Sequence, residues 1–142
     1  ADLVVSDVFA GAQTPAHLTT VEYYRVLAGL LSPEGVLLVN VADGAGLAFA
    51  RREVATVREV LPEVIVLAEV QTLKGRRFGN LVVIASTGAL PATDLSRTAA
   101  RAAFPYRFLA GRDVVDWIGD AEPFSDADAQ ASPVPRSGTW FS

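Results

Sequence analysis

Two aspartates stand directly after apolar segments that we predict to be strands, where a carboxylate could take part in chemistry. Asp7 follows residues 3–5, and Asp43 follows residues 36–41. Ligands of open α/β sheets bind beyond the carboxyl ends of the strands, and a carboxylate there can accept a proton or hold an amine. Each also has a structural alternative. Asp7 could cap its loop, and Asp43 could cap the next helix, which is the favoured role for Asp43.

Three further groups could do chemistry, each with a simpler alternative. His17 is the single histidine and can titrate near neutral pH, but a lone histidine is more often a surface or packed polar residue. The Gly44-Ala45-Gly46 segment is only part of a Gly-rich nucleotide fingerprint, so we expect it to relax a turn. Lys74, Arg76 and Arg77 could hold an anion, although a charged hairpin tip is usually a solvated surface.

Composition excludes several classes of site. The 142 residues suit one domain, and the net charge of −4 argues against nucleic acid as the main ligand. The absence of cysteine excludes disulfides, zinc–thiolate sites and cysteine nucleophiles, and a single histidine excludes a multi-histidine metal site. No segment resembles a signal peptide or is long enough to span a bilayer, so we expect a cytoplasmic protein. The chain has no Met and begins in an apolar strand, so we expect an upstream part to be missing.

The first 87 residues alternate between strand and helix patterns. Apolar β-branched segments predict strands at residues 3–5, 36–41, 64–70 and 81–85. Apolar residues at helical spacing predict helices at residues 21–31 and 47–61, the first of them capped by Thr19 with Glu22. Residues 71–80 are too few for a crossover helix, so they predict a hairpin.

These elements predict an α/β fold with a mostly parallel sheet and a closing antiparallel hairpin. We assign residues 1–87 to one half of a Rossmann-like domain. Residues 88–119 are predicted to be a helical extension, with helices at 93–104 and 113–118. Residues 120–142 are rich in Asp, Ala, Ser and Pro and predict an extended tail, which could be disordered.

Several motifs, in their order and spacing, resemble spermidine synthase-like proteins. They are residues 3–9 (LVVSDVF), Pro15-Ala16, residues 22–24 (EYY), residues 31–37 (LSPEGVL) and residues 75–83 (GRRFGNLVV), followed by residues 124–128 (FSDAD) with Pro133. This family comprises polyamine aminopropyltransferases with the class I S-adenosylmethionine-dependent methyltransferase fold. The resemblance covers residues 2–135 and is limited to the carboxyl-terminal half of the fold. It is strongest with actinobacterial proteins, some of which are fused to membrane domains.

The resemblance implies a reaction and a set of site residues. An amine acceptor attacks the aminopropyl carbon of decarboxylated S-adenosylmethionine, and methylthioadenosine leaves. Asp7 matches the aspartate that removes a proton from the attacking amine, as expected for a base beside an ammonium. Pro15, Ala16 and Leu18 match the loop that packs on the adenine. Asn40 and Asp43 fall at the strand end that contacts the substrate.

The chain also departs from the family pattern. Ala10 replaces the second aspartate, which grips the far amine of the polyamine. Asn40 and Ala42 stand where Gln and Glu are usual, and Leu73 replaces a Tyr that contacts the polyamine. A site with fewer carboxylates binds a doubly charged amine such as putrescine less well, so the acceptor need not be putrescine.

Three hypotheses therefore remain. The first is an aminopropyltransferase with a nucleoside co-substrate, an amine acceptor and no tightly bound cofactor. The second is a methyltransferase of the same fold that uses S-adenosylmethionine. The third is a non-catalytic module for dimerisation or docking. The family's Gly-rich loop and ribose-binding acid belong to a missing amino-terminal half, so we do not expect this chain alone to be an efficient enzyme. The sheet edge left by that half predicts a homodimer.

Overall fold

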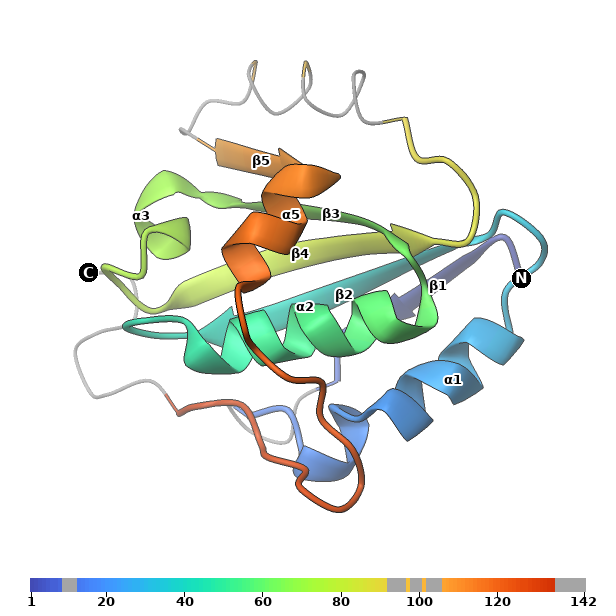
Figure 1. Ribbon diagram of the computed structural model, residues 1–142, viewed down its shortest axis with the longest axis horizontal. Coiled ribbons are helices and arrows are strands. Elements are labelled where there is room, and N and C mark those ends of the chain that lie inside the picture. Colours follow the sequence, from blue (N-terminus) through green and yellow to red (C-terminus); the bar gives the residue numbers. More distant parts are fainter. Residues whose placement is uncertain (9–12, 92–96, 98–100, 102–105, 135–142) are drawn as a thin grey trace.

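A computed structural model of the chain describes residues 1–8, 13–91, 97, 101 and 106–134, which form one sheet with helices (Figure 1). The elements, in order, are β1 (Leu3–Ser6), the 3-10 helix η1 (Ala16–Leu18), α1 (Val21–Gly29), β2 (Val36–Asp43), α2 (Ala48–Val60), β3 (Glu63–Glu69), α3 (Val70–Leu73), β4 (Gly79–Ser86), β5 (Tyr106–Ala110) and α5 (Arg112–Ile118). The predicted strands and helices of the first 87 residues are confirmed to within a few residues at their ends.

The five strands are arranged in the order β1-β2-β4-β3-β5. β1 pairs with β2 in parallel, whereas β4 is antiparallel to both β2 and β3, and β5 is antiparallel to β3. β1, β2 and β3 therefore run in the same direction. The α/β class is confirmed, but the expectation of mostly parallel pairing is wrong, because β4 inserts between two strands that would otherwise be parallel neighbours.

The closing antiparallel strand was correctly expected from the short connection between β3 and β4. α3 is a single helical turn that ends at Leu73, and Gly75 follows with φ of 70°, a conformation that favours glycine. The chain then reverses, and Ala68 pairs with Leu81. This connection is too short to pass over the sheet to a parallel position, so β4 pairs with β3 in the antiparallel direction.

The core lies on one face of the sheet, under α1, α2 and α5 (Figure 1). Strand residues side by side on this face, such as Val39, Val83 and Val66, are almost fully buried in one cluster with residues of α2. Burial of this face is the main driving force for the fold. No helix in the described ranges is long and apolar enough to cross a membrane.

The cap of α1 differs from the prediction by one residue. Thr20, not Thr19, is the N-cap, and its hydroxyl accepts a hydrogen bond from the backbone N–H of Tyr23 at 3.2 Å. Thr19 instead donates its hydroxyl to the carbonyls of Ala16 and Gln130. The expected helix start is preserved because two threonines are adjacent, and the first is used to hold the tail.

The segment after residue 88 is not wholly helical as predicted. Residues 106–110 form β5, which pairs with β3 from Ile65 to Glu69, and α5 confirms the predicted helix at 113–118. The predicted helix at 93–104 falls almost entirely outside the described residues. This strand was not predicted, because its five residues show too little alternation of apolar and polar side chains to distinguish them from the Ala/Arg-rich segment before them.

The tail is irregular but well packed up to residue 134. Phe124 is completely buried in the core cluster and lies 5.5 Å from Phe49, centroid to centroid. The guanidinium of Arg52 lies 3.9 Å from the Phe124 ring centroid and donates to the Asp128 carboxylate at 2.6 Å. The hydrogen bond from the backbone N–H of Ser125, and then the one from Arg52, lower the pKa of Asp128. The tail is therefore part of the domain through residue 134.

We expect Phe124→Ala to destabilise the chain by about 3–5 kcal/mol, because it empties a fully buried aromatic position. The measurement is the free energy of unfolding in urea. Val134→Ala is the control, since Val134 is 58% exposed and its truncation should cost no more than about 0.5 kcal/mol. Equal effects of the two substitutions would show that the tail does not contribute to the core.

Candidate functional site

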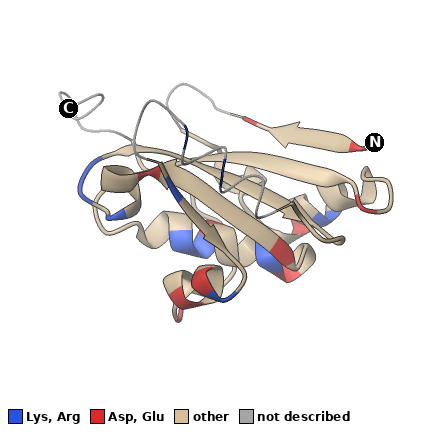
Figure 2. Ribbon diagram, turned by 90° about the horizontal axis from the view of Figure 1, so that it is seen from above, with Lys and Arg blue, Asp and Glu red and all other residues tan. Residues whose placement is uncertain are grey.

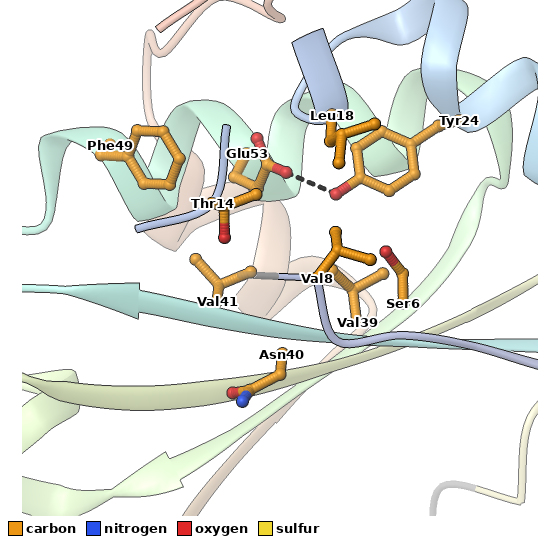
Figure 3. Close-up of a pocket in the computed structure, with 10 residues that line it drawn as sticks. All are labelled: Ser6, Val8, Thr14, Leu18, Tyr24, Val39, Asn40, Val41, Phe49 and Glu53. Carbon is orange, nitrogen blue, oxygen red and sulfur yellow. Dashed lines mark hydrogen bonds between the residues drawn. The ribbon is translucent and has the colours of Figure 1, made fainter. Parts of the chain in front are cut away.

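A small cavity lies at the carboxyl ends of β1 and β2, under α1 and α2 (Figure 3). It is lined by Ser6, Val8, Thr14, Leu18, Tyr24, Val39, Asn40, Val41, Phe49 and Glu53. Its volume of about 10 Å³ is room for about one water molecule. The walls are mostly apolar, and the polar groups come from β1, the following loop, α1 and α2.

Glu53 is the most unusual residue of this cavity. It lies on α2 between Ala50 and Val57, on the face that packs against the sheet, and is only 2% exposed. Tyr24 of α1 donates its hydroxyl to Glu53 Oε1, as the dashed line in Figure 3 shows. Glu53 Oε2 is buried and has no hydrogen-bond partner in the described part of the chain. One oxygen of a buried carboxyl is thus without a hydrogen bond to the described residues.

Burial controls the ionisation of this pair. Loss of hydration raises the pKa of Glu53 from its ordinary 4.5 to about 8, although the hydrogen bond from Tyr24 acts in the opposite direction. Burial, and then the proximity of Glu53, raises the pKa of Tyr24 well above its ordinary value of 10. Both groups are therefore neutral at pH 7 when nothing else is bound beside them.

Two further contacts frame the cavity. The hydroxyls of Ser6 and Tyr23 share a hydrogen bond of 2.8 Å, which ties the end of β1 to α1. Thr14 donates its backbone N–H to Ser132 Oγ at 2.7 Å and accepts from the Ser132 N–H at 3.1 Å. The buried Ser132 thus holds the loop after β1 from the tail side.

The structure brings Asp7, which follows β1, together with Asn40 of the neighbouring strand β2. Asn40 Nδ2 donates to Asp7 Oδ1 at 3.1 Å, and Asp7 is exposed. Figure 3 shows the Asn40 side chain on the opposite side of β2 from Val39 and Val41. The Asp7 carboxylate and the Glu53 carboxyl therefore lie on different sides of the sheet, both at its carboxyl edge.

Asp43 is buried, and backbone amides occupy both of its carboxylate oxygens. Gly44 N–H donates to Oδ1 and Ala50 N–H donates to Oδ2, each at 2.7 Å. Burial raises the pKa of Asp43, and these two amides oppose the shift. The expectation that Asp43 is the N-cap of this helix is wrong, because the N-cap is Leu47, which makes no side-chain capping bond. Asp43 lies further upstream and accepts instead from Ala50, the third residue of α2, so it still satisfies an amide of the first turn.

The loop predicted to pack on a nucleoside lies beside the cavity. Pro15, Ala16 and Leu18 are half-buried in and around η1, and Leu18 lines the cavity. His17 is exposed. Ala10, which replaces the family's second aspartate, falls outside the described residues.

The basic residues between β3 and β4 do not line the cavity and lie at the end of the sheet opposite the N-terminus (Figure 2). Arg77 pairs with Glu69 at 3.1 Å, and both side chains are about one-third exposed. Lys74 and Arg76 are exposed, and the Nε of Arg77 is buried without a hydrogen-bond partner among the described residues.

Comparison with known proteins gives two matches. The chain is 31% identical to a probable spermidine synthase from Corynebacterium glutamicum of known structure, with a TM-score of 0.78 over 88% of this chain and 47% of that one. It is 30% identical over 83 residues to an N-terminal histidine N-methyltransferase from Emericella nidulans, covering 58% of this chain and 15% of that protein. No family model matches the sequence.

The chain therefore spans about half the length of the solved structure that it resembles. The resemblance to spermidine synthase-like proteins is confirmed, and so is the Rossmann-like, methyltransferase-type fold. One matched protein is named a probable spermidine synthase and the other an N-methyltransferase, and each is longer than this chain.

We expect the stability of the chain to fall as pH rises from about 5 to 8, in part because of Glu53. The raised pKa means that the unfolded state ionises Glu53 first, so stability present below pH 4.5 is lost as pH rises through about 8. Glu53→Gln should remove this contribution, of the order of a few kcal/mol. The measurement is the free energy of unfolding in urea at several pH values.

Glu59→Gln is the matched control, because Glu59 is exposed on the same helix. It should leave the pH dependence as in the parent chain. If Glu53→Gln and the parent chain lose stability equally between pH 5 and 8, Glu53 is not a buried neutral acid.

Proposed function

We propose that the protein to which this chain belongs transfers an aminopropyl group from decarboxylated S-adenosylmethionine to an amine acceptor, with Asp7 as the base. The observation that carries the proposal is the position of Asp7 directly after β1, oriented by Asn40 from the next strand. The likeness to a probable spermidine synthase supports the same reaction.

The chemistry needs a carboxylate at this place. The acceptor arrives as an ammonium, which has no free electron pair, so Asp7 takes its proton before nitrogen attacks. The nitrogen then bonds to the aminopropyl carbon, the bond from that carbon to the sulfonium sulfur breaks, and methylthioadenosine leaves. An exposed carboxylate can return the proton to water after each turnover.

We assign the nucleoside to the side of the loop that carries Pro15, Ala16 and Leu18. These residues are only half-buried and offer an apolar wall for a base. Asn40 serves by orienting Asp7, and we propose that Asp43 acts through the turn that it caps. The rest of the nucleotide site would come from residues upstream of this chain.

β1 lies at one end of the sheet, and its Leu3 and Val5 side chains are more than half exposed. We propose that this edge is covered in the whole protein by upstream residues of the same fold, with a homodimer as the alternative. We also propose a cytoplasmic location, on the basis of the likeness to a probable spermidine synthase.

The second candidate is a methyltransferase that uses S-adenosylmethionine itself. The observation in its favour is the 30% identity to an N-terminal histidine N-methyltransferase. The two candidates differ in the group that leaves sulfur, so turnover of decarboxylated and ordinary S-adenosylmethionine by the full-length protein separates them.

We expect Asp7→Asn in the full-length protein to lower the turnover of decarboxylated S-adenosylmethionine with an amine by about a hundredfold or more. Asn keeps the size and the hydrogen bond to Asn40 but cannot take a proton. The measurement is kcat for methylthioadenosine release.

Asp113→Asn is the control, because Asp113 is exposed on α5, and it should leave kcat unchanged. Activity of Asp7→Asn equal to that of the parent protein would exclude Asp7 as the base. If Asp7→Asn leaves every activity of the full-length protein intact, with either co-substrate, the non-catalytic module is favoured.

A further inference from the structure

We propose that Ser132 in the tail is a positioning residue for the nucleoside. It fixes residues 13–19, the nucleoside loop, in the position that the nucleoside packs against. The inference rests on the proposed function, which assigns the nucleoside to Pro15, Ala16 and Leu18 of this loop. It gives the tail, which has no part in the proposed reaction, a role in binding the co-substrate.

Ser132 holds the start of the nucleoside loop through three hydrogen bonds. Its hydroxyl oxygen accepts from the backbone N–H of Thr14 at 2.7 Å, and its own N–H donates to the Thr14 carbonyl at 3.1 Å. Its carbonyl accepts from Gln13 Nε2 at 2.8 Å. Ser132 is completely buried and Thr14 is 9% exposed, so water cannot readily replace these bonds. One tail residue therefore fixes two neighbouring residues of the loop.

The other end of the nucleoside loop is held by the same part of the tail. Thr19 is completely buried, and its hydroxyl donates to the carbonyls of Gln130 at 3.0 Å and Ala16 at 2.8 Å. Among the described residues, the hydrogen bonds from the loop to other segments all go to Gln130 and Ser132. Residues 15–18, which form the wall for the nucleoside, thus lie between two ends that the tail holds.

The tail is anchored in the core before it reaches the nucleoside loop. Phe124 is buried, its N–H donates to Thr56 Oγ of α2 at 2.9 Å, and its carbonyl accepts from the Val21 N–H of α1 at 2.8 Å. The ion pair of Arg52 with Asp128 adds a further contact to α2. The position of the loop is therefore set, through the tail, by α1 and α2.

The Ser132 hydroxyl should affect nucleoside binding and not the chemical step. Without it, the Thr14 N–H is buried with no acceptor, which destabilises this position of the loop. The loop then occupies the binding position in only a fraction of the molecules, and the Kd of the nucleoside rises in inverse proportion to that fraction. Asp7 is oriented by Asn40 of β2 and does not contact Ser132, so its action as a base should not change.

The test is calorimetric titration of the full-length protein with 5′-methylthioadenosine and, separately, with S-adenosylhomocysteine. Ser132→Ala should raise the Kd of the nucleoside that binds by about tenfold. The KM of the corresponding co-substrate should rise by a similar factor, while kcat stays within about twofold of the parent value. Thr19→Val removes the hydrogen bond to Gln130 and should raise the same Kd by about threefold or more. A residue with a merely structural role would lower the free energy of unfolding and leave these Kd and KM values unchanged.

Ser125→Ala is the matched control. Ser125 lies in the same tail, but its hydroxyl bonds to Asp128 and to the N–H of Ala127 and not to the nucleoside loop. This variant should bind the nucleoside as the parent protein does. The inference is overturned by an unchanged Kd in Ser132→Ala, by an equal rise in Ser125→Ala, or by a fall in kcat at unchanged KM. If Ser132→Ala does not fold, Thr19→Val decides by the same criteria.

The outcomes separate this inference from the proposed function. Binding of S-adenosylhomocysteine that weakens in Ser132→Ala, without any aminopropyl transfer, overturns the proposed function only. Aminopropyl transfer with an unchanged Kd in Ser132→Ala overturns the inference only. A parent protein that binds neither nucleoside overturns both.

Discussion

The buried carboxyl group of Glu53 constrains how α1 and α2 pack against each other. Glu53 has apolar neighbours on α2 and lies against the sheet, so its charge is costly and its proton is held to about pH 8. The Tyr24 hydroxyl donates a hydrogen bond to Glu53 and so joins α1 to α2 inside the core. Rotation of either helix would break this bond and leave the Tyr24 hydroxyl buried without a partner, so the pair constrains the position of α1 and of the loop before it.

The sequence predicted most of the fold because the signals are local. Apolar β-branched segments specified four strands, and helical spacing specified α1 and α2. The position of β4 could not be predicted, because pairing between β2 and β4 joins Val39 to Val83 across more than forty residues. A hairpin signal says that β4 lies beside β3, but it does not say which strand lies on the other side.

The sequence pointed to one part of the candidate site and missed another. Asp7 was chosen because it follows a strand, and Asn40 because the family pattern has a substrate-contacting residue at that position. The structure joins the two by a hydrogen bond, and their roles stay predictions. Glu53 was missed, although a signal was present: it falls three residues after Ala50 and four before Val57, on the apolar stripe of α2. An acidic residue on such a stripe must be neutral or paired. Its partner Tyr24 could not be identified, because the contact between α1 and α2 is tertiary.

The carboxyl groups of Asp7 and Glu53 differ mainly in their exposure to water. Asp7 is exposed, so it can exchange protons with water and suits repeated proton transfer. Glu53 is buried, so its pKa is raised to about 8 and it keeps its proton at pH 7. The same edge of the sheet therefore carries one exposed carboxylate that can exchange protons with water and one buried carboxyl that stays neutral.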